Sequence, residues 1–275
     1  MGRLEALTPE RRDDVLAYLA RRPYDNVYVA WLIATGQAAN GDVVVWLDSA
    51  NVVAGVCYLG LQIVPFADDD AAIDAFAERA RRARSTRMIV GPRRNVERFW
   101  SQARASMGTP TITRENQPVY ALETPATLAN VSPADGDIAR ATRDELDEIV
   151  PHSAAMIAGE VGGDPTRASY EFRARTGRII DAGWWWRYRV GGRLAFMCNV
   201  GSATAQTAQL QGVWSPREMR GTGHATRGLG AICVRLLAEF PTLCLYVNDF
   251  NLDAIALYER VGFTRVGEFR TILFS

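Results

Sequence analysis

The sequence contains no lysine, so arginine supplies all 31 of its basic side chains, and 31 aspartates and glutamates balance them. Without lysine, Schiff-base chemistry on a side-chain amine of the protein is excluded. A chain without excess positive charge also offers no electrostatic reason to expect DNA or RNA as its main partner. We therefore expect small ligands and no nucleic acid.

Histidine and cysteine are also scarce. The 275 residues include two histidines and four cysteines, and the cysteines stand singly among apolar neighbours with no CxxC pair: Cys57, Cys198, Cys233 and Cys244. This spacing argues against a structural zinc site and is typical of buried thiols in a reducing compartment. We expect no metal.

Long apolar runs are absent as well. No stretch approaches the roughly 20 residues that a membrane-spanning helix needs, and the N-terminus has no apolar signal core. Hydrophobic residues nevertheless make up 48% of the chain, which is enough for a full core, and the length suits two domains. We expect a cytoplasmic protein without a membrane partner.

Hydrophobic periodicity predicts a mixed α/β (α+β) chain whose second half repeats the first in outline. The first half is expected to contain helices from residue 8 and over 27–36, strands over 42–47, 52–58 and 59–64, a helix over 71–83, a strand over 88–91, a helix over 96–106 and a strand over 118–122. The second half is expected to contain a strand over 138–141, helices over 143–150 and 153–158, strands over 184–190, 194–200 and 209–214, a helix over 225–239, a strand over 243–247, a helix over 252–261 and a strand over 264–274. Proline, glycine, alanine and threonine between the halves predict domains over 1–125 and 138–275, joined by a linker over 126–137.

The strongest functional signal is RGTGHA, residues 220–225, which we call the glycine loop. A strand leads into it and an amphipathic helix follows. Backbone N–H groups at the start of a helix lack partners within the helix, and glycine lets an anion approach them. The loop therefore predicts a phosphate site, with a glycine turn of purely structural purpose as the alternative. A dinucleotide-binding fold fits less well, because a hairpin precedes the loop instead of a parallel strand.

A second motif, LYVNDFNLDAIALYERVGF, covers residues 245–263. Asn251 is positioned to cap a helix, and Tyr258 lies about two turns further along the same face, with the small Ala254 between them. The glycine loop and this segment together resemble the GNAT superfamily of acyl-CoA-dependent N-acetyltransferases. The resemblance covers about residues 138–275, and it implies a GNAT fold, in which helices flank a mostly antiparallel, twisted central sheet.

The resemblance also implies acetyl-CoA as the cosubstrate and assigns roles to particular residues. Backbone amides of the glycine loop would hold the CoA pyrophosphate, at Gly221, Thr222, Gly223, His224 and Ala225, and Arg220, the first residue of the motif, would also belong to the cofactor site. The strand before the loop would pair with the pantetheine arm, and the amide of Val213 or Trp214 would donate to the thioester oxygen. Asn251 would contact the pantetheine. Tyr258 would act as the general acid that protonates the leaving thiolate, unless it only packs.

The general base has no obvious position in the sequence. Family members often place a carboxylate near the strand that precedes the loop, but Gln209 and Gln211 stand there and neither accepts a proton usefully at neutral pH. Glu160 and Asp249 are the candidates from elsewhere, and each can equally be a solvated or capping carboxylate.

The first half lacks a glycine loop. The acidic segment VPFADDDAA, residues 64–72, stands before the corresponding helix, where negative charge suits a cap and repels phosphate. We interpret this half as a degenerate GNAT-like domain in a tandem arrangement. The sequence thus predicts an N-acetyltransferase that acts on a primary amine of a small molecule or a protein N-terminus, by direct attack in a ternary complex. The alternatives are an acyl-CoA sensor without turnover, suggested by the missing base, and a Fem-like aminoacyl-tRNA transferase, suggested by the tandem layout but disfavoured by the neutral charge.

Overall fold

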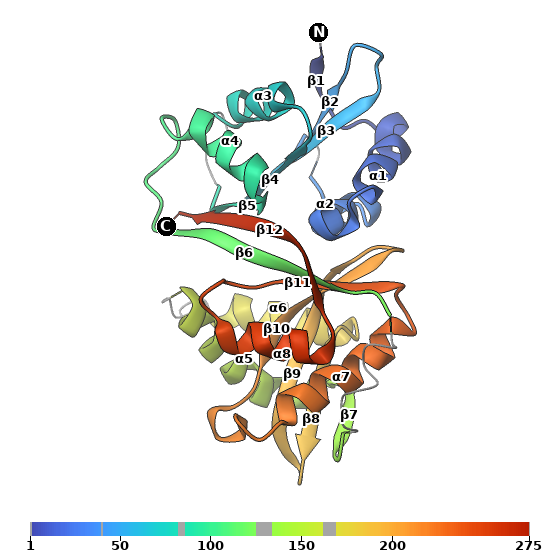
Figure 1. Ribbon diagram of the computed structural model, residues 1–275, viewed down its shortest axis with the longest axis vertical. Helices are drawn as coiled ribbons and strands as arrows, with labels where there is room; N and C mark the ends of the chain where they lie inside the picture. Colours follow the sequence, from blue (N-terminus) through green and yellow to red (C-terminus); the bar gives the residue numbers. More distant parts are fainter. Residues whose placement is uncertain (1, 40, 82–85, 125–133, 162–168, 275) are drawn as a thin grey trace. The chain divides into compact units, whose positions relative to one another are not determined.

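The computed structural model describes residues 2–39, 41–81, 86–124, 134–161 and 169–274 (Figure 1). They form two compact units. The first comprises Met1–Tyr120, Tyr246–Leu252 and Arg265–Ser275, and the second comprises Ala121–Leu245 and Asp253–Thr264. The units are therefore not two consecutive halves, because the chain re-enters the first unit twice near its C-terminal end. Of the linker predicted over 126–137, residues 126–133 lie outside the described residues.

The first unit contains strands β1 (Arg3–Ala6), β2 (Val43–Leu47), β3 (Val53–Leu59), β4 (Gln62–Ala67), β5 (Met88–Pro92), β6 (Ile112–Leu122) and β12 (Thr264–Leu273). Its helices are α1 (Arg12–Ala20), α2 (Pro23–Ala34), α3 (Asp70–Ala80) and α4 (Arg93–Ala103). The strand order is β1-β2-β3-β4-β5-β12-β6. Strands β1 to β4 are antiparallel neighbours, whereas β5 runs parallel to β4 and antiparallel to β12.

The two faces of this sheet bury alternate residues, as the twofold repeat of a strand requires. Val43 and Val45 of β2 pack into a core that includes residues of α1 and α2. Val44, between them, belongs to a second core formed with α3 and α4. Each face is thus covered by its own pair of helices (Figure 1).

The second unit contains strands β7 (Asp137–Arg140), β8 (Trp185–Val190), β9 (Arg193–Ala203), β10 (Thr207–Trp214) and β11 (Thr242–Tyr246). Its helices are α5 (Leu146–Val161), α6 (Ser169–Asp181), α7 (His224–Leu237) and α8 (Leu252–Val261). The strand order is β11-β10-β9-β8-β7, with β7 to β10 antiparallel and β11 parallel to β10. The second unit therefore repeats the plan of the first, four antiparallel strands followed by a parallel one, as the sequence predicted in outline.

Most predicted elements are confirmed within a few residues, and the exceptions have physical reasons. The Gly191–Gly192 turn joins β8 to β9, and both glycines have positive φ angles, 55° and 77°. Two short helices, over 143–150 and 153–158, were predicted on either side of Pro151, a residue type that lacks an N–H donor and clashes with the preceding turn of a helix. The structure instead has one helix, α5, with Pro151 inside it. Leu146, Ile149 and Ala154 bury a continuous apolar face across the proline. Strand β1 and helix α6 were not predicted.

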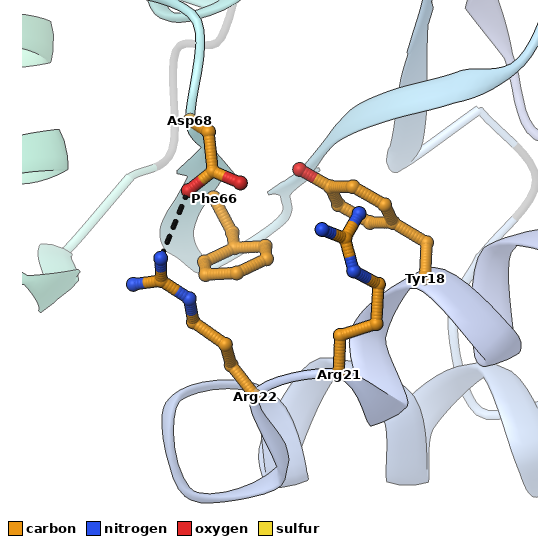
Figure 2. A pocket seen from close by; sticks show the side chains of 5 residues that line it. All are labelled: Tyr18, Arg21, Arg22, Phe66 and Asp68. Carbon is orange, nitrogen blue, oxygen red and sulfur yellow. Dashed lines mark hydrogen bonds and ion pairs between the residues drawn. The ribbon is translucent and has the colours of Figure 1, made fainter.

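A small pocket lies in the first unit beside the carboxyl end of β4 (Figure 2). It has a volume of about 70 Å³ and is lined by Tyr18, Arg21, Arg22, Phe66 and Asp68. Arg22 forms an ion pair with Asp68 at 3.2 Å, and the guanidinium of Arg21 lies 5.5 Å from the centroid of the Tyr18 ring. Side chains that interact with one another thus surround this pocket.

Candidate functional site

The parallel strands β10 and β11 of the second unit remain paired over a short distance. Their described register runs from Thr207 opposite Thr242 to Gln209 opposite Cys244 and extends no further. Strand β10 continues to Trp214, so in the described part of the chain its second half has no partner strand on the edge that faced β11. That edge carries backbone N–H and C=O groups that a ligand can pair with.

A β-bulge lies in this second half of β10. Gln211 faces Asn199 of β9, but Trp214 faces Met197, so β10 contains one extra residue between the two pairs. Gly212 in the bulge has a φ of 63°, and a Cβ atom there would lie 2.7 Å from the Asn199 side-chain oxygen. A bulge bends its strand and takes one residue out of the ladder. The change of direction thus falls at Gly212 and Val213, and the predicted thioester-oxygen donors, the amides of Val213 and Trp214, lie at this point of the strand.

Asn199 is a polar side chain that the sequence reasoning missed. It is 6% exposed and lies against the bulge. Nothing in the local sequence distinguishes it, because it occupies an ordinary strand position, and only the register of β9 on β10 brings it next to Gly212.

The glycine loop leads into α7, and two of its glycines have a left-handed backbone conformation. Gly221 and Gly223 have φ angles of 73° and 80°, which other residues adopt only with strain. Gly223 is the N-cap of α7, and no side chain caps the helix. A Cβ atom at Gly221 would meet nothing within 4 Å. Gly221, Thr222 and Gly223 are exposed, and a helix start without a capping side chain is the arrangement in which backbone N–H groups can bind an anion.

Helix α3 of the first unit starts differently. Its N-cap, Asp69, accepts a hydrogen bond from the Ala71 N–H at 2.9 Å. A carboxylate of the protein thus already satisfies part of this helix start, and its charge opposes a phosphate. The expectation that the acidic segment of the first half serves as a cap is confirmed.

Arg220 and Trp214, both predicted to bind the cofactor, contact each other. The Arg220 guanidinium lies 4.5 Å from the centroid of the Trp214 indole, and its Nε donates to the Ser215 carbonyl at 3.1 Å. This cation–π contact fixes the chain where it leaves β10. Trp214 also packs against the core formed by α5, α6 and the sheet.

A polar cluster, not foreseen from the sequence, lies behind the glycine loop. Arg227 of α7 contacts His224 and the Thr222 carbonyl in the loop, and Asp135 from the segment before β7. Tyr188 of β8 donates its hydroxyl to Asp135. This bond, with further contributions from the Asp135 backbone and from Arg227 and His224, holds the pKa of Asp135 below its ordinary value. Arg227 lies one helical turn after His224, and that spacing was the available sequence signal.

The other predicted residues are more widely distributed. Tyr258 lies on α8 in the second unit, is 6% exposed, and contacts Phe263 edge-on with 6.0 Å between ring centroids. Asn251, immediately before α8, and the exposed Asp249 belong to the first unit, where the Asp249 N–H donates to the Asn116 carbonyl at 3.4 Å. Glu160 lies in α5, but its side chain is outside the described residues. The structure thus brings Val213, Trp214 and residues 220–225 together in one unit with Tyr258.

The cysteines are unsuited to nucleophilic chemistry. Burial raises the pKa of Cys198 to about 12, and burial also raises the pKa values of Cys57 and Cys233 well above the ordinary range. These thiols are therefore protonated at neutral pH, and a thiolate is the reactive form. Within the described ranges, no group of three or more histidine, cysteine, aspartate or glutamate side chains could hold a metal ion. No helix in the same ranges combines the length and apolar character needed to cross a bilayer.

Comparisons with known proteins add a fold assignment to this geometry. Residues 43–149 match a family described as a domain of unknown function, DUF4081. No curated protein matches the chain in sequence.

Solved structures match over nearly the whole chain. A GNAT-family acetyltransferase from Colwellia psychrerythraea has a TM-score of 0.60 at 14% identity, with 99% of this chain and 100% of that chain covered. A tandem GNAT protein from the clavulanic acid biosynthesis pathway has a TM-score of 0.57 at 15% identity, with 98% of each chain covered. A GCN5-related N-acetyltransferase from Sphaerobacter thermophilus has a TM-score of 0.59 at 13% identity, with 98% and 94% covered.

The chain therefore has the fold of GNAT acetyltransferases, present as two GNAT-like units. Because a tandem GNAT protein is covered along its length, the agreement extends to both units. The GNAT fold predicted from the two motifs of the second half is confirmed, and so is the mixed α/β class.

Proposed function

We propose that the chain is an acyl-CoA-dependent N-acetyltransferase whose active unit is the second one. The observation that carries the proposal is the uncapped start of α7 behind two left-handed glycines, Gly221 and Gly223, at the end of a bulged strand. A pyrophosphate has the size and the negative charge of the ligands that such a helix start binds. The fold shared with known acetyltransferases supports the same choice.

The residues of the second unit suit the two ends of an acyl-CoA. Amides of Gly221 to Ala225 would bind the pyrophosphate, while the unpaired edge of β10 would hydrogen-bond the pantetheine arm. When bound, acetyl-CoA supplies an activated acetyl group. The amide of Val213 or Trp214, turned by the bulge, would donate to the thioester oxygen, where negative charge develops during attack.

Protonation of the departing thiolate is the role we propose for Tyr258. A tyrosine hydroxyl, with an ordinary pKa of about 10, is nearly matched to a thiol of about 8.5, so it can donate without a large energetic mismatch. Asn251 would contact the pantetheine. Glu160 and Asp249 remain our candidates for the base that deprotonates the amine.

We propose a primary amine of a small molecule or a protein N-terminus as the acceptor, attacked directly in a ternary complex. Direct attack is supported by the buried, protonated Cys198 and Cys233, which are poor acceptors for an acyl-enzyme. The equal numbers of basic and acidic side chains favour a small acceptor over tRNA.

A second candidate is an acyl-CoA sensor that does not turn over. It is favoured by the absence of a carboxylate on β10, where Gln211 and Gln209 hydrogen-bond to each other at 3.3 Å. Such a glutamine pair cannot remove a proton from an amine at neutral pH.

A two-step experiment tests both candidates. Thermal unfolding is followed with CoA, acetyl-CoA and longer acyl-CoAs, since a ligand at about 100 times its Kd stabilises the folded state by roughly 2.7 kcal/mol. Release of free thiol from acetyl-CoA is then measured against a panel of primary amines. Stabilisation with amine-dependent thiol release supports the enzyme, and stabilisation without release supports the sensor. No stabilisation by any CoA compound would exclude both.

A further inference from the structure

A chain of polar contacts joins the glycine loop to the segment before β7. Tyr188 donates its hydroxyl to an Asp135 oxygen, and the same carboxylate lies 3.6 Å from Nε of Arg227. The Nη2 atom of Arg227 donates to the Thr222 carbonyl at 3.4 Å and lies 2.8 Å from Nδ1 of His224. The Arg227 side chain is 22% exposed, so it is largely enclosed by these partners.

The contact with Thr222 determines which way one peptide group of the loop faces. In a trans peptide the C=O and N–H bonds point in opposite directions. Because Arg227 holds the carbonyl of the Thr222–Gly223 peptide, the N–H of Gly223 faces away from Arg227. A Cβ atom on Gly223 would lie 2.8 Å from Nη1 of Arg227, so a larger residue there would displace the guanidinium, and the φ of 80° separately favours glycine.

The contact with His224 determines where that imidazole carries its proton. A guanidinium has only donors, so Nδ1 of His224 must accept, and the proton of the neutral ring is on Nε2. The edge-on packing of the ring against Tyr188, with 6.0 Å between centroids, keeps the imidazole in this position.

We propose that Arg227, held by Asp135, is a positioning residue that orients the glycine loop for the CoA pyrophosphate before the ligand binds. The inference rests on the proposed function for the identity of the ligand. The Asp135 carboxylate forms an ion pair, without a hydrogen bond, with Nε of Arg227, and its charge favours the guanidinium in the position from which Nη2 reaches the loop. A donor that is already oriented pays no reorganisation cost on binding, so loss of this arrangement weakens the ligand's phosphate end alone.

The binding test compares Arg227→Met with Arg235→Met. Arg235 is on the same helix, and its guanidinium bonds its own helix at the Ala231 carbonyl, so this control removes the same charge away from the loop. We expect Arg227→Met to weaken CoA binding about 10-fold, the effect of one hydrogen bond to a charged group. Binding of S-acetylpantetheine, which lacks the pyrophosphate, stays unchanged.

Asp135→Asn, the milder variant, weakens CoA binding about threefold, since Arg227 is retained. Equal CoA affinities for the Arg227 and Arg235 variants, or equal losses for both ligands, overturn the proposal.

A second readout needs no ligand. The chain has two histidines, so protein labelled with ¹⁵N-histidine gives two imidazole signals, and His152→Gln assigns them. For the neutral ring we expect the Nε2–H tautomer at His224, and its loss in Arg227→Met. A Nδ1–H tautomer in the unaltered protein overturns the positioning role itself. Absence of CoA binding by a protein with the expected tautomer overturns the proposed function instead.

Discussion

At the scale of single residues, Gly212 gives the bulge its backbone conformation, and it lies beside Val213, whose amide we propose as a donor to the thioester oxygen. Its φ of 63° and the Asn199 oxygen, 2.7 Å from where a Cβ atom would lie, both favour glycine. A left-handed conformation costs a residue with a side chain about 1–2 kcal/mol, before any clash. Bulges of this kind often lie next to active sites, because they redirect a strand locally.

We expect Gly212→Ala to lower both stability and acetyl transfer. Gly191→Ala is the matched control, since Gly191 also has a positive φ, 55°, but a Cβ atom there meets nothing within 4 Å. Urea unfolding should show a loss of about 1–2 kcal/mol for the control and more for Gly212→Ala. In activity assays the control should match the unaltered protein, whereas Gly212→Ala should lower kcat/KM at least 10-fold. Similar activities for the two variants would mean that the bulge does not orient a catalytic amide.

Tyr258 gives a second prediction at this scale. Tyr258→Phe keeps the ring that packs on Phe263 and removes only the hydroxyl. If the hydroxyl protonates the leaving thiolate, kcat should fall about 100-fold while KM for acetyl-CoA changes little. Steady-state kinetics with both substrates varied measure this. An unchanged kcat would leave Tyr258 a packing residue.

At the scale of elements, the turn before α5 is tied to β8 through Glu145. Its carboxylate accepts from the Thr142 N–H at 2.9 Å, and it pairs with Arg187 and Arg189, each at 3.0 Å. Burial raises the pKa of Glu145, but these donors outweigh it, and the pKa lies below its ordinary value. The ionised form is thus favoured in the folded protein.

This arrangement predicts a stability that depends on acid pH. With a folded-state pKa below the unfolded value of about 4.3, Glu145 contributes fully above about pH 5, and its contribution is lost as the pH falls through 4.3 towards the folded-state pKa. Urea unfolding between about pH 6 and pH 3 should show a shallower loss of stability for Glu145→Gln than for the unaltered protein. Asp147→Asn, which removes an exposed ion pair with Arg173, is the control for loss of charge. Parallel curves for the unaltered protein and Glu145→Gln would contradict the prediction.

Sequence periodicity predicted most elements well, because their burial is local. The glycine loop was also predicted from the sequence, since the glycine residues Gly221 and Gly223 indicate a backbone with positive φ angles. The bulge was not predicted, because it depends on the register between β10 and β9, in which Gln211 pairs with Asn199 and Trp214 pairs with Met197. The same holds for Asp135 and Arg227, which are far apart in sequence and meet only when α7 packs on the sheet. Predictions from sequence succeed for features that one segment determines by itself, and they miss features that depend on the contact between two distant segments.

At the scale of the whole molecule, the last strand belongs to the sheet of the first unit. Strand β12 pairs with β5 from Phe269 opposite Pro92 to Leu273 opposite Met88. Buried polar contacts reinforce its place: Thr271 donates to Gln117 of β6, and Gln117 donates to Asn248 at 3.0 Å. The C-terminal residues therefore contribute to the core of the N-terminal half.

Removal of residues 265–275 should destabilise the first unit more than the second. We expect hydrogen exchange in the truncated chain to show lost protection in β5 and β6, while β8 and β9 remain protected, because opening follows cooperative units. Thr271→Val, which removes the contact with Gln117 and keeps the strand, should have a smaller effect in the same direction. Equal loss of protection in both units would show that they unfold together.

The position of β12 also has a consequence for folding during synthesis. The chain is made at about 5–20 residues per second, so roughly 10–35 seconds pass between the appearance of β5 and that of its partner β12. During that interval one edge of β5 has no partner strand, and such an edge invites pairing with other chains. The part of the protein that is synthesised first is therefore completed last, and its nascent form is the stage at which we expect protection by chaperones to matter most.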